Sequence, residues 1–164
     1  MKKPNPLALD EQVCFPLYAA SNLIQRIYRP LLEPLGLTYA QYLVMLVLWE
    51  EDGVPVTHVG ERVLLDTGTL SPLVRRLEKS GLVAKKADAR DGRVVVLQLT
   101  AKGRRLRERA QTVPEALVCR MLAGQKPDAA AVEQVLALRA QLHALVAGLQ
   151  RATDSETPRQ ARSA

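Results

Sequence analysis

The sequence has few of the residues on which metal sites and redox enzymes depend. Its 164 residues include two histidines, two cysteines, one tryptophan and one phenylalanine. The cysteines do not form a Cys-x-x-Cys motif, and the chain offers no paired metal ligands around His58 or His143. We therefore expect no metal, no cofactor and no enzymatic activity.

Long apolar runs are also missing. Hydrophobic residues make up 48% of the chain, but no uninterrupted apolar run approaches the roughly 20 residues that a membrane span needs. The initial Met-Lys-Lys is followed by Pro, Asn and Pro rather than by an apolar segment, which is unlike a signal peptide. We expect a cytoplasmic protein without a membrane partner, whose thiols stay reduced.

Positive charge is concentrated in one part of the chain. The segment from Arg75 to Arg109 contains twelve Lys and Arg residues and four Asp and Glu residues, a net charge of +8. Since the whole chain carries +6, the remainder sums to −2. A local positive field suits a polyanionic partner. The alternative is that these side chains only solvate helix surfaces.

Residues 64–100 have the pattern of a helix followed by a β-hairpin. Apolar residues form one stripe on a helix Leu70–Lys79: Leu70, Leu73, Val74 and Leu77. Ser80-Gly81 ends this helix, because glycine adopts the left-handed conformation that closes helices. The β-prone runs Leu82–Lys86 and Val94–Leu99 follow, with a turn-rich linker between them. This layout predicts a winged helix-turn-helix, with the helix in the major groove of DNA and the hairpin tip at the flanking minor groove.

The start of this helix has two interpretations. A cap at Ser71 makes Pro72 the first helical residue, where its missing N–H costs nothing. A start near Thr67 instead holds Pro72 just beyond the first turn, where it bends the axis.

Helical patterns also precede this segment. Residues from Leu7 to about Leu35 form one helix or two, stopped by prolines at the far end. Thr38 opens an apolar, buried helix from Tyr39 to Glu51 with capping-box spacing. A turn at residues 52–55 then leads to a short helix that Thr57 caps.

Two helices are predicted after the hairpin. Thr100 caps a helix that reaches about Leu122 and is kinked by Pro114. After a break, Asp128 starts a last helix that reaches about Leu149. With the first helix, they carry more apolar surface than a winged helix of this size covers, which favours a symmetric dimer.

The predicted fold class is mainly α with a small β-hairpin wing. We expect residues 37–100 to form the winged helix-turn-helix DNA-binding core, and residues 1–36 and 101–150 to form a helical dimerisation region. Residues 151–164 are polar, lack an apolar pattern and are expected to be disordered.

The expected DNA contacts come from the helix and the wing. The candidates are Thr69, Ser71, Arg75, Arg76, Arg90 and Arg93. The hydroxyls serve either a base or a phosphate, and the helix arginines serve guanine edges or phosphates. Arg93 is expected in the minor groove. Asp88 and Asp91 brace the hairpin through ion pairs, unless they are ordinary turn residues.

Several motifs resemble a known family. The wing motif Asp88-x-Arg90-Asp91-x-Arg93, followed by Leu99-Thr100-x-x-Gly103, is similar to the MarR family of winged-helix repressors. Three N-terminal motifs resemble its OhrR branch, which senses organic hydroperoxides. They are Val13-Cys14-Phe15-x-Leu17-Tyr18, Tyr28-Arg29-Pro30-Leu31-Leu32 and Gly36-Leu37-Thr38-Tyr39-x-Gln41-Tyr42. The resemblance runs from about Leu9 to Leu122.

In that branch the sensor is a cysteine early in the first helix, which Cys14 matches. A thiolate is the species that attacks a peroxide, and a helix N-terminus favours the thiolate. The resemblance implies that Tyr28 and Tyr39 of the partner subunit donate hydrogen bonds to the sulfur. It also implies that Phe15 and Tyr18 shape an apolar pocket for organic hydroperoxides. On composition alone, a cysteine beside valine and phenylalanine is more often a small buried hydrophobe.

Cys119 corresponds to the resolving cysteine of two-cysteine OhrR proteins. The resemblance implies that peroxide turns Cys14, the peroxidatic cysteine, into a sulfenic acid, which condenses with Cys119 of the other subunit to an intersubunit disulfide. Spacing does not show that the sulfurs meet, and a disulfide needs Cα atoms within about 7 Å. In the simpler interpretation, Cys119 is a buried hydrophobe.

The chain is therefore predicted to be a redox-sensing repressor. As a reduced homodimer it binds an inverted-repeat operator in double-stranded DNA, and organic hydroperoxide releases it. One alternative is a MarR-type repressor that a small aromatic ligand releases, with incidental cysteines. Another is a thiol peroxidase, and a third is a winged helix that contacts only proteins, which the +8 segment disfavours.

Overall fold

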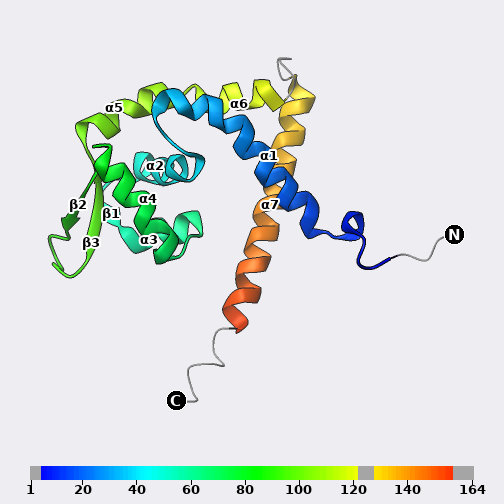
Figure 1. Ribbon diagram of the computed structural model, residues 1–164, viewed down its shortest axis with the longest axis horizontal. Helices are drawn as coiled ribbons and strands as arrows, with labels where there is room; N and C mark the ends of the chain where they lie inside the picture. Colours follow the sequence, from blue (N-terminus) through cyan, green and yellow to red (C-terminus); the bar gives the residue numbers. More distant parts are fainter. Residues whose placement is uncertain (1–4, 122–127, 157–164) are drawn as a thin grey trace. The chain divides into compact units, whose positions relative to one another are not determined.

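Two structural units make up the chain, residues 1–121 and residues 122–164. The computed structural model describes residues 5–121 and 128–156 (Figure 1). The first unit contains a helical core, a small antiparallel sheet and two helices, α5 and α6, that follow the sheet. The described part of the second unit is helix α7 (Ala129–Glu156). The predicted fold class, mainly α with a small β wing, is confirmed.

Helix α2 (Tyr39–Glu50) is the buried centre of the first unit. Its predicted capping box is present, because Gln41 N donates to Thr38 Oγ1 over 3.4 Å and Thr38 N donates to Gln41 Oε1 over 2.9 Å. Such a cap contributes about 1 kcal/mol. Seven of its twelve residues are buried, among them Val44, Met45 and Leu48, so α2 fills the core.

Helix α4 (Thr67–Lys79) begins earlier than Leu70, and this resolves the two interpretations of Pro72. Asp66 is the N-cap, since its Oδ1 accepts a hydrogen bond from Thr69 N over 2.9 Å. Pro72 therefore lies inside the helix, and Ser71 does not cap it. The predicted stop is confirmed, with Gly81 at φ +68°.

The predicted hairpin consists of β2 (Val83–Ala87) and β3 (Val95–Leu99), which pair antiparallel. The segment 52–55, predicted to be only a turn, also contains the short strand β1 (Val54–Pro55). This strand pairs with β3, which makes β3 the central strand of three. Pro55 is compatible with this edge position, since an edge strand needs fewer backbone donors.

Other helix boundaries also differ from the prediction. Helix α1 (Cys14–Leu32) is preceded by the 3-10 turn η1 (Leu9–Glu11), so it starts later than Leu7. It continues through Pro30 and is followed by η2 (Glu33–Leu35). Helix α3 (Val56–Val63) starts with Pro55 as its cap residue. Thr57 therefore lies inside α3 and is not its cap.

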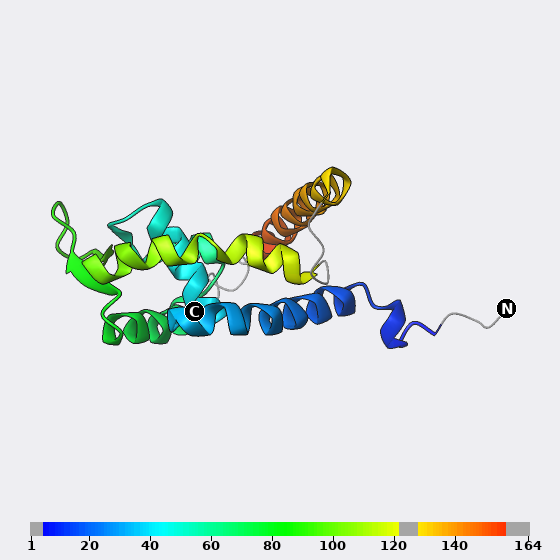
Figure 2. The same ribbon diagram turned by 90° about the horizontal axis from the view of Figure 1, so that it is seen from above.

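The helix predicted after Thr100 is divided into two. Thr100 caps α5 (Ala101–Ala110) as expected, because Gly103 N donates to its Oγ1 over 3.0 Å. Helix α6 (Val113–Met121) follows and packs against α1 (Figure 2). Pro114 lies in the first turn of α6, where a backbone N–H would have no intrahelical acceptor, so the missing N–H of proline costs no hydrogen bond. The predicted break at residues 124–127 lies outside the described residues.

Helix α7 begins as predicted, since Ala131 N donates to Asp128 Oδ1 over 2.7 Å. It runs to Glu156, so residues 151–156 are helical rather than disordered; the rest of the expected tail is outside the described range. Large apolar side chains along α7 are exposed: Val132, Val135, Leu136, Leu138, Leu142, Leu145, Val146 and Leu149.

Within the described residues, no single helix is long and apolar enough to cross a membrane. Residues 14–35 and 39–50 satisfy these criteria only as a pair, and a bend of 66° separates them. The second member of this pair is α2, the buried helix of the core.

Candidate functional site

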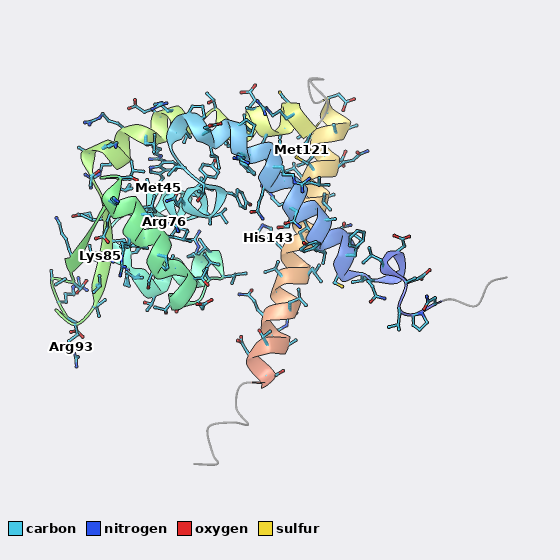
Figure 3. The ribbon with its side chains drawn as sticks, viewed as in Figure 1. Met45, Arg76, Lys85, Arg93, Met121 and His143 are labelled. Carbon is cyan, nitrogen blue, oxygen red and sulfur yellow. The ribbon has the colours of Figure 1, made fainter. Side chains whose placement is uncertain are left out.

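Helix α4 has a buried face and an exposed polar face. Leu70, Val74 and Leu77 point into the core. The four helix residues predicted to contact DNA are all exposed: Thr69, Ser71, Arg75 and Arg76. Within the described part of the chain, the Arg75 and Arg76 side chains make no ion pair or hydrogen bond. Figure 3 labels Arg76 on α4. The structure therefore gathers hydroxyls and unpaired guanidinium groups on one helix.

The hydroxyl groups of Thr69 and Ser71 on α4 already donate hydrogen bonds. Thr69 Oγ1 donates to Asp66 Oδ2 over 2.8 Å, and Ser71 Oγ donates to the Thr67 carbonyl over 2.7 Å. The backbone N–H of Thr69 and then its hydroxyl lower the pKa of Asp66. This carboxylate therefore stays ionised at neutral pH and holds the first turn of α4.

The tip of the hairpin is fixed by its two acidic residues. Asp88 Oδ1 accepts backbone hydrogen bonds from Arg90 over 2.8 Å and from Asp91 over 3.0 Å. Asp91 binds the Arg93 guanidinium through two hydrogen bonds of 3.0 Å. Arg93 lies at the tip of the hairpin and points away from the domain (Figure 3).

The expected bracing by ion pairs therefore applies to one of the two acids. Hydrogen bonds from Arg93 lower the pKa of Asp91. Backbone N–H groups of Asp91 and Arg90 lower the pKa of Asp88, which acts as a turn residue rather than as an ion-pair partner. Arg90 forms no ion pair among the described residues and stays available at the wing.

Part of the positive segment has a structural role that the sequence did not reveal. Lys102 Nζ donates to the Ser80 carbonyl at the end of α4 over 2.8 Å. Arg104 forms an ion pair of 2.6 Å with Asp52, whose other oxygen accepts from Leu99 N. These two cations fix α5 to the winged-helix core. The positive charge available to DNA is therefore smaller than the net +8 of the segment.

Cys14 is the first residue of α1 and is exposed. The first turn of this helix offers fewer free donors than an ordinary N-terminus. Pro16 has no N–H, and Phe15 N donates to the Gln12 carbonyl over 3.2 Å. Hydrogen bonds that stabilise a thiolate at Cys14 must therefore come largely from elsewhere. Phe15 is half-buried, and Tyr18 is exposed one turn further on.

Tyr28 and Tyr39 lie together, with ring centroids 4.8 Å apart, and Tyr42 is 5.8 Å from Tyr28. Burial raises the pKa of Tyr28 to about 12, and its tyrosine neighbours add to the shift. Burial also raises the pKa of Tyr39 and Tyr42. At neutral pH these phenols are protonated, so each one can donate a hydrogen bond.

The thiol and this tyrosine cluster are far apart within one chain. Cys14 and Tyr28 are fourteen positions apart on the continuous helix α1. At a rise of 1.5 Å per residue, this corresponds to about 21 Å along the helix axis. The structure thus brings Cys14 near Phe15 and Tyr18 and brings Tyr28 near Tyr39, but it does not bring the two groups together within a protomer.

Cys119 lies on α6 and is partly buried. Both cysteines are free thiols. Helix α6, which carries Cys119, packs against α1, which carries Cys14.

A cavity adjoins the tyrosine cluster where α1, η2 and α2 meet. Its volume is about 450 Å³. It is lined by Gln25, Arg29, Glu33, Gly36, Leu37, Thr38 and Tyr39. Sequence reasoning missed Gln25 as a lining residue, because nothing in its local pattern indicates that α1 turns it toward α2.

The high pKa of Tyr28 leads to a titration prediction. In an alkaline titration followed at 295 nm, we expect one tyrosine to ionise near pH 12 and Tyr28→Phe to lose that step. Because the folded-state pKa is raised, the stability that neutral Tyr28 contributes is present below pH 10 and is lost between about pH 10 and 12. Persistence of the step in Tyr28→Phe would contradict this assignment.

Helices α2, α3 and α4 followed by a β-hairpin define a winged-helix protein, and the exposed face of α4 is typical of the DNA-binding members. Residues 26–109 match the family model for the transcriptional regulator SarA/Rot. The chain is 48% identical over 115 residues to the HTH-type transcriptional regulator TtmR of Methylorubrum extorquens. That match covers 70% of this chain and 59% of TtmR.

The organic hydroperoxide resistance transcriptional regulator of Bacillus subtilis is 41% identical over 112 residues, which cover 68% of this chain and 76% of that protein. The solved structure of reduced AbfR bound to DNA has a TM-score of 0.69 and 30% identity, and covers 86% of this chain and 94% of AbfR. A disulfide form of AbfR has a TM-score of 0.60 and 31% identity, with 87% and 92% covered.

The chain belongs to the MarR family of winged-helix transcriptional regulators. Its similarity to the Bacillus subtilis regulator supports the OhrR branch. These relatives are transcriptional regulators, in agreement with the expectation that the chain is not an enzyme.

Proposed function

We propose that this protein is a transcriptional repressor that binds operator DNA as a homodimer. The observation that carries this proposal is the exposed face of α4, where Thr69, Ser71 and two unpaired arginines lie beside a hairpin tipped by Arg93. Helix α4 enters the major groove and the hairpin reaches the minor groove. A regulator of this type acts in the cytoplasm, where thiols are kept reduced.

The proposed signal is an organic hydroperoxide. The Cys14 thiolate attacks the distal peroxide oxygen and breaks the O–O bond. The sulfur becomes a sulfenic acid, and the departing alkoxide takes a proton and leaves as an alcohol. Phe15 and Tyr18 provide the nearby apolar surface, which favours organic hydroperoxides. The similarity to the Bacillus subtilis regulator supports this choice of signal.

A second copy of the chain completes the thiol site in this proposal. The first turn of α1 offers Cys14 few N–H donors, and the Tyr28 of the same chain is about 21 Å away along α1. In a symmetric dimer, Tyr28 and Tyr39 of the other protomer donate to the Cys14 sulfur. The exposed apolar side chains of α1 and α7, which include Leu23 and Leu142, support such a dimer.

Cys119 resolves the sulfenic acid in the last proposed step. Its thiolate attacks the Cys14 sulfur of the other protomer, so that an S–S bond forms and water leaves. A disulfide form is known for AbfR, a neighbour of 31% identity. Formation of this bond moves the terminal helices and rotates the two α4 helices, so that they no longer match the spacing of the two operator half-sites.

A ligand-released repressor is the second candidate function. The cavity of about 450 Å³ beside Tyr39 has the size of a small-molecule site, and Arg29 offers a cation for an acidic group. In this case an aromatic acid rather than peroxide releases the DNA, and the cysteines have no role.

Selection from a random DNA pool tests the proposal. The reduced protein is expected to enrich an inverted repeat with half-sites about one helical turn, or a multiple of it, apart. Addition of an organic hydroperoxide is expected to release the selected DNA. No enrichment would contradict DNA binding, whereas release by aromatic acids but not by peroxide would favour the second candidate.

A further inference from the structure

The Thr69 and Ser71 hydroxyl groups on the exposed face of α4 have lost their freedom to donate. A free hydroxyl donates one hydrogen bond and accepts others, so it binds donors and acceptors alike. The Thr69 hydroxyl instead points at Asp66 Oδ2, 2.8 Å away, and the Ser71 hydroxyl points at the Thr67 carbonyl, 2.7 Å away.

The direction of both hydrogen bonds follows from the chemistry of the partners. Asp66 is ionised at neutral pH, and a carboxylate only accepts, so the shared proton belongs to Thr69. The Thr67 carbonyl also only accepts, so that proton belongs to Ser71. What remains toward solvent on each oxygen is lone pairs.

We propose that Thr69 and Ser71 are acceptors at the DNA interface and read the exocyclic amino group of adenine or cytosine. In the major groove, the adenine N6 and cytosine N4 amino groups are the donors. Guanine N7 and O6, thymine O4 and phosphate oxygens are acceptors, which these two hydroxyls do not satisfy. This inference rests on the proposed binding of DNA by α4 and gives that helix a base preference.

The geometry disfavours the alternative in which Thr69 binds phosphate. To donate to a phosphate oxygen, its hydroxyl must leave Asp66 Oδ2. The carboxylate would then lose this hydrogen bond while it faces a second negative charge. Asp66 keeps its other hydrogen bond, from Thr69 N at 2.9 Å, so it stays in place at the start of α4.

The arginines further along α4 are complementary to these acceptors. Arg75 and Arg76 only donate, and neither has a partner among the described residues. Ser71 and Arg75 lie one turn apart on the same side of the helix. Thr69 and Ser71 therefore offer acceptors to amino groups, whereas Arg75 and Arg76 offer donors to guanine edges or phosphates.

The test removes single amino groups from the selected operator. Adenines are replaced by purine and cytosines by 2-pyrimidinone, and binding is measured by fluorescence anisotropy for wild type, Thr69→Val and Ser71→Ala. We expect deletion of one amino group in each half-site to weaken wild-type binding about 3- to 10-fold per hydrogen bond. The variant that lacks the matching hydroxyl is expected to be insensitive to that deletion.

Ser80→Ala is the matched control. The Ser80 hydroxyl also donates to the carbonyl four residues earlier, that of Arg76, over 2.9 Å, but it lies at the opposite end of α4. This variant is expected to keep the full dependence on amino groups. Thermal unfolding shows that each variant is folded, as expected for exposed positions.

The possible failures differ. If wild type binds the operator but no amino deletion matters, or if both hydroxyl variants keep the wild-type dependence, this inference is wrong and DNA binding stands. Loss of affinity only with methylphosphonate at a phosphate would assign the hydroxyls to the backbone and also overturn it. If wild type selects no DNA at all, the proposed function fails together with this inference.

Discussion

Replacement of Gly103 by alanine is expected to lower the free energy of unfolding of the first unit by about 2 kcal/mol. A Cβ at this position would meet the Leu82 carbonyl oxygen at 2.1 Å and Leu99 Cδ2 at 3.2 Å. The closer of these two contacts is with a backbone atom, so rotation of a side chain cannot relieve it. Overpacking of this kind costs about 3 kcal/mol, of which the better helix propensity of alanine returns about 1 kcal/mol.

The close approach of α5 to the core explains why the cost is not relieved by a small shift. The Trp49 indole N–H donates to the Gly103 carbonyl over 2.9 Å, and this bond is buried. Moving α5 away from Leu82 would lengthen it. The measurement is thermal or urea unfolding of Gly103→Ala beside Gly92→Ala, whose added Cβ meets nothing within 4 Å. Equal stability of the two variants would contradict this account of the helix–sheet contact.

Cys14→Ser is expected to abolish the release of operator DNA by organic hydroperoxide. Serine has nearly the same shape as cysteine, but its hydroxyl is not a nucleophile toward peroxide at neutral pH, so no sulfenic acid forms. Cys14 is exposed, so the reduced variant should fold and bind the operator with wild-type affinity. We expect peroxide to weaken wild-type binding by at least about 10-fold, a change of 1.4 kcal/mol, and to leave the variant unchanged.

A gel shift with reduced and peroxide-treated protein measures this effect. Cys119→Ser is the companion variant, since it keeps the peroxidatic thiol and lacks the proposed resolving thiol. It should still form the sulfenic acid, but without a covalent dimer. If Cys14→Ser releases DNA with peroxide as wild type does, Cys14 is not the sensor.

Local sequence signals were sufficient for much of the fold. The capping box at Thr38 and the caps at Thr100 and Asp128 depend on residues three positions away, so they could be recognised directly. The hairpin followed from two β-prone runs around a turn. These features need no knowledge of distant parts of the chain.

Features that depend on distant residues were missed. Strand β1 exists because Val54 pairs with Leu97, which is far along the chain. The ion pair between Asp52 and Arg104 also joins distant segments, so Arg104 was counted as a cation for DNA. The start of α4 was ambiguous because a cap at Ser71 and a start near Thr67 were both compatible with the sequence, and the hydrogen bond to Asp66 decided it.

The candidate site was predicted in its residues but not in its geometry. Helical spacing was enough to predict the exposed face of α4. That the Thr69 and Ser71 hydroxyls already donate to Asp66 and to the Thr67 carbonyl could be seen only in the structure. The tyrosine cluster and the distance between Cys14 and Tyr28 likewise appear only once α1 is known to be continuous.

Transfer of the redox signal between subunits is the central claim, and mixed dimers test it most directly. Differently tagged Cys14→Ser and Cys119→Ser chains are unfolded together, refolded, purified as the mixed dimer and treated with organic hydroperoxide. This dimer keeps one Cys14 and one Cys119, on different chains. The account predicts a covalent dimer on a non-reducing gel that carries both tags, with operator binding lost. Absence of that covalent species, while wild type forms it, would contradict the claim.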